Sequence, residues 1–132
     1  MTDLDYQRLA GFRFALRQFL DFSAQAARAC GLTPPQHQAL LVIRALTVSG
    51  NATITDVARQ LLSRHHSTVE LVDRLESLRL VRRRADARDR RRVALVLTPR
   101  ATRILERLSV VHLEELRRVG RSLRAMLAAL GK

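Results

Sequence analysis

Apolar residues recur at alternating steps of three and four along the first thirty residues, which is the spacing of one face of an α-helix. This face consists of Leu9, Phe12, Leu16, Phe19, Ser23, Ala26 and Cys30. All four phenylalanines of the chain lie in the same segment, so we expect the helix to need a large partner surface. Gly31 has the position of a carboxyl-terminal helix cap.

A second helix is predicted to begin after residue 33. Thr33 can cap its first turn, and the two prolines that follow suit the first helical positions. We expect its buried side to consist of Leu40, Leu41, Ile43 and Leu46. The sequence Ser-Gly-Asn at 49–51 is expected to end this helix.

Two short amphipathic helices are predicted next, with a tight turn between them. Thr53 or Thr55 can cap the first helix, and Ser63 can cap the second, which runs to about residue 78. The inward-facing positions are Ile54, Val57, Ala58 and Leu61 in the first helix and Leu71, Val72, Leu75 and Leu78 in the second. Two short helices joined by so tight a turn predict a helix-turn-helix.

A hairpin and further helical segments complete the predicted order. Residues 80–84 and 93–97 alternate as strands around a polar tip. Thr98 and Pro99 can open another helix, and we expect Gly120 to interrupt it before a last helix. The pattern therefore predicts a mainly α fold with a small β wing: a winged helix-turn-helix framed by long N-terminal and C-terminal helices.

The charge balance narrows the class of partner. The 132 residues carry 24 basic and 12 acidic side chains, a net charge of +12, and Lys132 is the only lysine. Seven arginines lie within residues 82–92, against two acids. A surface this positive favours a polyanion, either nucleic acid or an anionic membrane face. No apolar run is long enough to cross a bilayer, and the first residues are unlike a signal peptide, which favours the cytoplasm.

Four segments carry a resemblance to a known family. They are STVELVDRLE at 67–76, LVRR at 80–83, DARDRR at 86–91 and VLT at 96–98. In this order they resemble the MarR family of bacterial transcription regulators, and the resemblance extends over nearly the whole chain. It implies a homodimer whose first, fifth and sixth helices interlock, with dimerisation helices at about 1–30 and 99–132 and a DNA-binding part at about 36–98.

The same resemblance implies a mode of action. The recognition helix at 64–78 would enter the major groove of double-stranded DNA, and the wing at 80–98 would enter the minor groove of a palindromic operator. Many members of the family repress genes and release DNA when a small phenolic or other aromatic effector, or an oxidant, acts on them. We therefore expect a repressor that needs no cofactor.

The fourth predicted helix offers a polar face to DNA. His66, Glu70 and Arg74 are spaced by four and lie opposite the apolar positions. With the first turn of the helix, the expected DNA-contacting residues are Arg64, His65, His66, Ser67, Glu70 and Arg74. Glu70 can accept from cytosine or orient an arginine, and Arg74 can hold a phosphate or pair with Glu70. Because the adjacent histidines diverge by about 100° on a helix, we expect no metal site.

The wing is expected to use arginine at its tip. Asp86 and Asp89 can pair with Arg88 or its neighbours and so shape the turn, while Arg88, Arg90 and Arg91 remain available to DNA. A guanidinium suits the negative potential of a narrow A·T-rich minor groove. The alternative is a solvated charged hairpin, which is disfavoured because so many like charges repel at close range.

Cys30 and His37 are the candidates for regulation. Cys30 lies on the apolar face beside Gly31, which favours ordinary packing, with an oxidation switch as the alternative. His37 lies where the resemblance places an aromatic residue close to the family's ligand cleft. A buried structural histidine is the preferred interpretation. His37 could still bind a carboxylate or phenol and, with His112, add pH sensitivity.

Other functional classes have weaker support. Charge alone would also suit a nonspecific architectural DNA- or RNA-binding protein. An enzyme is not expected, because no paired carboxylates, activated nucleophile or phosphate-cradling glycine loop is visible. The sequence departs from the family at Leu62, Arg79 and Ala101, where glycine is common. A left-handed backbone at Arg79 would cost roughly 1 kcal/mol.

Overall fold

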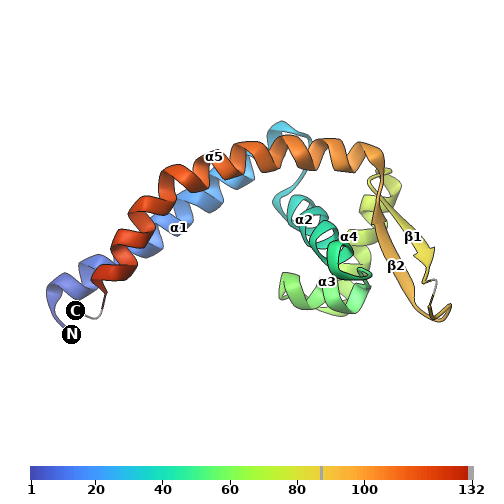
Figure 1. The fold of residues 1–132 in the computed structure, drawn as a ribbon, viewed down its shortest axis with the longest axis horizontal. Coiled ribbons are helices and arrows are strands. Elements are labelled where there is room, and N and C mark those ends of the chain that lie inside the picture. The colour runs from blue at the N-terminus through green and yellow to red at the C-terminus, as the bar shows by residue number, and fades with distance from the viewer. Residues whose placement is uncertain (87, 131–132) are drawn as a thin grey trace.

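The computed structural model of the chain describes residues 1–86 and 88–130. Its elements are α1 (Asp3–Ala29), α2 (Pro34–Ser49), α3 (Ile54–Leu61), α4 (His65–Ser77), β1 (Val81–Ala85), β2 (Val93–Leu97) and α5 (Pro99–Ala129). Figure 1 shows two parts, an arm in which α1 and α5 lie side by side and a head that holds the other elements. The expected mainly α fold with a small β wing is confirmed.

Local capping signals set the ends of the N-terminal helices. Thr2 and Thr33 begin α1 and α2 with capping boxes, and Thr53 is the cap of α3. At the end of α1, Gly31 has a φ of 79° and its N–H donates to the carbonyl of Arg28. The next N–H reaches back to the carbonyl of residue 27, which completes the hydrogen-bond pair of a Schellman cap.

The last helix corrects one expectation. Gly120 does not interrupt it: α5 runs unbroken from Pro99 to Ala129, so the predicted sixth helix is wrong. A glycine inside a helix costs about 1 kcal/mol relative to alanine. Packing of α5 along α1 offsets so small a cost.

Two smaller expectations also fail. Leu41 is 42% exposed, and the inward side of α2 is formed instead by Ala39, Leu40, Val42 and Ile43. Ser63 does not cap α4, because Arg64 occupies the cap position without a side-chain hydrogen bond. In both places local pattern alone selects the wrong residue.

The hydrophobic core lies in the head and extends to the first part of α5. Its largest fully buried side chains are Leu40, Ile43, Leu75, Leu80, Leu95, Leu108, Val57, Val72, Val81 and Thr68. β1 and β2 pair antiparallel, with Val81 opposite Leu97 and Ala85 opposite Val93. Ala52 adds an isolated bridge to Leu95, whose N–H donates to its carbonyl at 2.7 Å. The chain between α2 and α3 is thereby attached to the wing.

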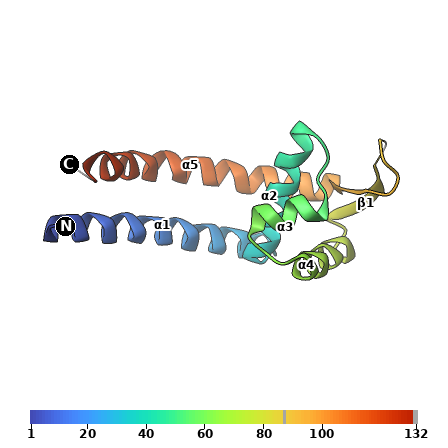
Figure 2. The same ribbon diagram turned by 90° about the horizontal axis from the view of Figure 1, so that it is seen from below.

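The arm contrasts with the head in how little it buries. α1 and α5 run antiparallel along its length, as Figure 2 shows from below. Of the 27 residues of α1, only Ala15 and Ala27 are buried. The Arg8 guanidinium donates to the Ala129 carbonyl at 3.0 Å and joins the far ends of the two helices. Along the described residues, no helix combines the length and hydropathy needed to cross a membrane.

Candidate nucleic-acid interface

The turn between α3 and α4 is held by a left-handed residue. Leu62 has a φ of 53°, its N–H donates to the Arg59 carbonyl, and the N–H of Ser63 donates to the Ala58 carbonyl. The Leu62 side chain is 95% exposed. This residue stands where glycine was expected, and it takes the glycine-like conformation at a cost of about 1 kcal/mol. The tight turn projects the amino-terminal end of α4 into solvent.

The polar face of α4 is open to solvent. The predicted DNA-contacting residues of this segment are all exposed: Arg64, His65, His66, Ser67, Glu70 and Arg74. The opposite side is buried through Val72, Leu75 and Thr68, whose hydroxyl donates to the carbonyl of residue 64 at 3.0 Å. The alternative pairing of Arg74 with Glu70 is not among the ion pairs of the described chain. Arg74 is therefore available to a phosphate.

The two aspartates of the wing bind mainly backbone. Asp86 Oδ1 accepts from the N–H of Arg88 at 2.9 Å, and Asp89 Oδ1 accepts from the N–H of Arg91 at 3.0 Å and from its Nε at 3.3 Å. The N–H of Asp86 donates to the Arg92 carbonyl, and the N–H of Arg92 donates to the Asp89 carbonyl. These bonds fold the tip without using the guanidinium of Arg88.

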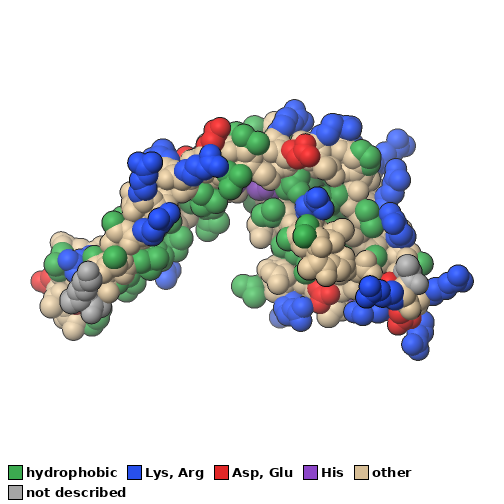
Figure 3. Space-filling model, viewed as in Figure 1, with side chains coloured by type: hydrophobic (Ala, Val, Ile, Leu, Met, Phe, Trp, Pro, Cys, Tyr) green, Lys and Arg blue, Asp and Glu red, His purple; other side chains and the backbone are tan. Residues whose placement is uncertain are grey.

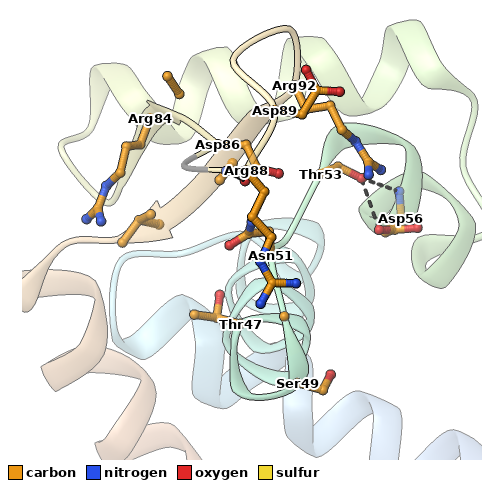
Figure 4. A pocket seen from close by; sticks show the side chains of 14 residues that line it. Thr47, Ser49, Asn51, Thr53, Asp56, Arg84, Asp86, Arg88, Asp89 and Arg92 are labelled. Carbon is orange, nitrogen blue, oxygen red and sulfur yellow. Dashed lines mark hydrogen bonds between the residues drawn. The ribbon is translucent and has the colours of Figure 1, made fainter.

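Asn51, in the loop after α2, contacts the wing at Asp86, a role that the sequence did not suggest. Asp86 is buried, and the Arg88 N–H holds the pKa of its carboxyl below the usual value, with smaller contributions from the Asn51 side chain and the charge of Arg92. Asn51 and the wing border a cavity of about 650 Å³. Figure 4 shows Arg88 lying over this cavity toward Thr47, which leaves Arg90 as the better candidate for the tip.

The wing arginines that the sequence predicts to contact DNA lie around the folded tip. Arg88, Arg90 and Arg91 all have exposed side chains. Ala87, in the middle of the predicted tip, lies outside the described residues, as do residues 131–132 of the predicted dimerisation region.

Arg83 joins the wing to α4, and sequence reasoning missed it. Its Nη2 lies 2.7 Å from Asp73 Oδ1 and its Nη1 lies 2.9 Å from Glu76 Oε1. Arg82 and Arg84, its neighbours in β1, are more exposed, as expected from strand alternation. Two acids three residues apart on α4 and a run of arginines in the following strand were the available signal. The double ion pair links α4 to the hairpin.

His37 and His112 pack against each other as a tilted pair where the arm meets the head. His37 is 6% exposed, and its ring centre lies 4.9 Å from that of His112. The Leu108 carbonyl can only accept, so His112 Nδ1 carries the proton for their 2.6 Å bond, and Nε2 lies 2.7 Å from the Ser23 hydroxyl. Burial lowers the pKa of His37, and the charge of His112 lowers it further.

A mostly apolar cavity of about 480 Å³ lies beside His37 and is also lined by Leu20, Pro34 and Leu71. Cys30 is half-buried and packs against the core. In the described part of the chain, no three His, Cys, Asp or Glu side chains are grouped to hold a metal ion.

A sequence model of the MarR family matches residues 31–92, from the end of α1 to the wing. No curated protein matches the chain. Among solved structures, Streptomyces coelicolor AbsC, a MarR family transcriptional regulator, is 20% identical, with a TM-score of 0.75 over 93% of this chain and 82% of that one.

Two further structures share the fold. A mutant of S. aureus MepR, bound to an oligodeoxyribonucleotide, is 23% identical, with a TM-score of 0.71 over 95% of this chain and 97% of that one. Bordetella bronchiseptica BpsR, whose DNA binding is regulated by 6-hydroxynicotinic acid, is 23% identical, with a TM-score of 0.62 over 84% of this chain and 74% of that one.

MarR family proteins are transcription regulators and not enzymes, in agreement with the expectation from the sequence. The match over residues 31–92 covers 62 of the 132 residues, and the fold along most of the chain is that of solved MarR family transcription regulators.

Proposed function

We propose that the protein is a dimeric, sequence-specific repressor that acts on double-stranded DNA in the cytoplasm. The observation that carries this proposal is the Arg83 double ion pair, which holds the exposed face of α4 and the arginine-bearing wing as one unit. Such a unit can place a helix in the major groove and a hairpin in the neighbouring minor groove of one duplex. The oligonucleotide-bound MepR mutant, which has the same fold, supports DNA as the partner.

The residues of α4 take different roles in this arrangement. Arg64, His65, His66 and Ser67 lie at the amino-terminal end, where free N–H groups and side chains meet base edges and phosphates. Glu70 accepts from cytosine or orients a neighbouring arginine, and Arg74 binds a phosphate further along. In the wing, Arg90 enters the minor groove while Arg88 and Arg91 contact its phosphates, on a tip shaped by Asp86 and Asp89.

The arm is the proposed dimer interface, with dimerisation segments at about 1–30 and 99–132 on either side of a DNA-binding part at about 36–98. The protein exposes 9324 Å², whereas a compact monomer of 15.0 kDa exposes about 7,000 Å². The excess is of the size that subunits of stable dimers bury. Exposed apolar side chains of the arm include Leu9, Phe14, Leu16, Leu20, Leu113, Leu116 and Leu127.

A small aromatic effector is proposed to bind in the cavity beside His37. This cavity has apolar walls from α1, α2 and α4, and the histidine supplies a polar group for a phenol or carboxylate. A ligand that wedges α1 against the head would change the spacing of the two α4 helices in a dimer. BpsR, which 6-hydroxynicotinic acid regulates, offers a parallel. Cys30 packs against the core and is assigned no part in this regulation.

The decisive experiment compares the DNA upstream of the protein's own gene with a scrambled duplex of the same length. We expect tighter binding to the upstream DNA, with log affinity falling by about 0.9 per phosphate contact for each unit of log salt. Equal affinity for the two duplexes would favour the nonspecific architectural alternative and overturn the proposal.

Two substitutions assign the grooves. Arg90→Ala should weaken binding most on sites with A·T pairs under the wing, and His66→Ala should change base preference at one half-site position. Arg124→Ala, on an exposed part of α5 far from the head, is the matched control. The groove assignments are wrong if both head variants bind as the control does at moderate salt.

A further inference from the structure

Five arginines form a basic surface that the proposed groove contacts do not use. This surface, called here the flank ridge, consists of Arg79, Arg82, Arg100, Arg103 and Arg107, all exposed. It begins on α5 and ends at the base of the wing. Figure 3 shows basic side chains along the right-hand margin of the molecule, from the start of α5 down to the wing tip.

Three separate segments bring the inner part of the flank ridge together. Arg79 follows α4, Arg82 belongs to β1 and Arg100 lies in the first turn of α5, and all three line an open cavity of about 620 Å³. The Arg100 guanidinium donates to the Leu78 carbonyl at 3.0 Å, and the Thr98 hydroxyl donates to the Arg79 carbonyl at 2.8 Å. These bonds to backbone hold the cavity in shape.

The positive charge of the flank ridge is not balanced within the described chain. Over residues 1–86 and 88–130, the ion pairs involve none of its five arginines. Glu76, the one carboxylate that lines the cavity, is already bound by Arg83. Arginines crowded in this way repel one another, and their planar guanidinium groups match the oxygens of phosphate. An extended chain of phosphates is the partner that this surface fits.

The wing separates the flank ridge from the groove contacts. β1 and β2 have five residues each, so the base of the wing lies about 13 Å from the strand ends at the tip. The flank ridge begins at this base and is therefore placed to meet other phosphates than those that the tip contacts. It is continuous with the tip along one side of the molecule, which favours a single DNA molecule touching both.

We propose that the flank ridge binds the phosphate backbone of DNA beyond each end of the operator, and that this DNA bends along the outer side of the wing. The inference rests on the proposed function, because it requires the wing tip to be placed on DNA. It predicts a longer footprint than groove contacts alone would give, and a bend of the flanking DNA toward the protein.

The test uses two duplexes that carry the same operator. The short one ends just beyond the wing contacts, and the long one adds about one helical turn, roughly 10 base pairs, on each side. We compare the full-length protein with a variant that carries Arg79→Gln, Arg82→Gln and Arg103→Gln. A variant with Arg117→Gln, Arg121→Gln and Arg124→Gln removes the same charge from exposed positions on the other half of α5. It is the matched control, with sedimentation to show that its oligomeric state is that of the native protein.

The native protein and the control should bind the long duplex at least about tenfold more tightly at low salt, with a steeper salt dependence, because each added phosphate contact contributes about 0.9 to the slope. The flank-ridge variant should lose this gain and bind the short duplex like the native protein. Energy transfer between dyes at the two ends of the long duplex should report bending by the native protein and by the control, but not by the flank-ridge variant.

Several results would overturn the inference. Equal affinity and equal salt slope for the two duplexes would do so, as would a gain that both variants retain. If the triple variant unfolds, the double variant Arg82→Gln and Arg103→Gln, which leaves left-handed Arg79 in place, gives the same comparison. If the native protein fails to bind even the short duplex, the proposed function itself is contradicted, so the two failures are distinguishable.

Discussion

The head and the arm of this protein differ in how much of their apolar surface one chain buries. In the head, α2, α3, α4 and the wing bury large side chains such as Leu40, Ile43, Leu75 and Leu95 completely. In the arm, α1 buries two alanines along 27 residues and leaves leucines and a phenylalanine in solvent. The head therefore obtains its stability from contacts within one chain, whereas the arm has apolar surface that one chain cannot cover. The difference supports the proposed dimer, in which a second copy covers the arm.

The largest effect is expected from charging the arm. The double variant Leu16→Glu and Leu116→Glu should dissociate the dimer, raising its dissociation constant by about a hundredfold or more, because unpaired carboxylates would be buried in the interface. Binding to a palindromic operator should fall with it. Sedimentation and DNA binding measure the two effects.

The matched control for charging the arm lies on the head. Val48 is 74% exposed on α2, and Val48→Glu should leave the oligomeric state unchanged. If the double arm variant sediments like the native protein, the arm is not the dimer interface and the contrast drawn between the two regions is wrong.

Shortening one side chain in the head and one in the arm tests the same difference between the two regions. Leu75→Ala should lower the free energy of unfolding by about 2–5 kcal/mol, because it opens a cavity in the head. Leu20 is 64% exposed in one protomer, and Leu20→Ala should destabilise only through the dimer. Its cost should therefore vary with protein concentration, while that of Leu75→Ala should stay nearly constant. Denaturant unfolding at two concentrations tests this, and a concentration-independent cost for Leu20→Ala would contradict it.

The head was also the part that the sequence predicted well, because its signals are local. Thr53 and Pro99 mark helix starts, alternation marks the two strands, and positive φ occurs at Leu62 and Arg79, where the family commonly has glycine. Such features depend on a few neighbouring residues. In the arm, by contrast, Gly120 was misjudged because its small local cost is outweighed by packing against a helix a hundred residues away in the chain.

The contacts that complete the candidate site were missed for a related reason. Arg83 reaches Asp73 and Glu76 across the α4–β1 junction, and Asn51 reaches the wing from the loop after α2. Neither residue carries a local pattern that distinguishes it from other arginines or from an ordinary helix breaker. Their roles depend on tertiary packing, which periodicity does not reveal.

The stability of the protein should depend on pH through His37, which is buried at the junction between head and arm. Because burial lowers the pKa of His37, the unfolded chain binds a proton at a higher pH than the folded one. Stability should therefore be complete above the ordinary histidine value of 6.5 and fall as pH decreases below it, toward the lower folded pKa. His37→Phe should flatten this part of the profile. Urea unfolding between pH 7 and pH 5 measures it, and equal slopes for the two proteins would count against the prediction.

The smallest effect concerns strain inside the head. Leu62→Gly should stabilise the protein by about 1 kcal/mol, because glycine adopts the left-handed conformation without the penalty that a Cβ brings. The leucine side chain is 95% exposed, so its removal costs little packing. Arg79→Gly relieves the same kind of strain and should give a similar gain, but it also removes a member of the flank ridge.

The two glycine variants therefore separate stability from DNA binding. Both should raise the denaturation midpoint, whereas only Arg79→Gly should weaken binding to the long duplex. A lower midpoint for Leu62→Gly would contradict the prediction, because the conformational entropy that glycine loses on folding would then outweigh the relief of strain.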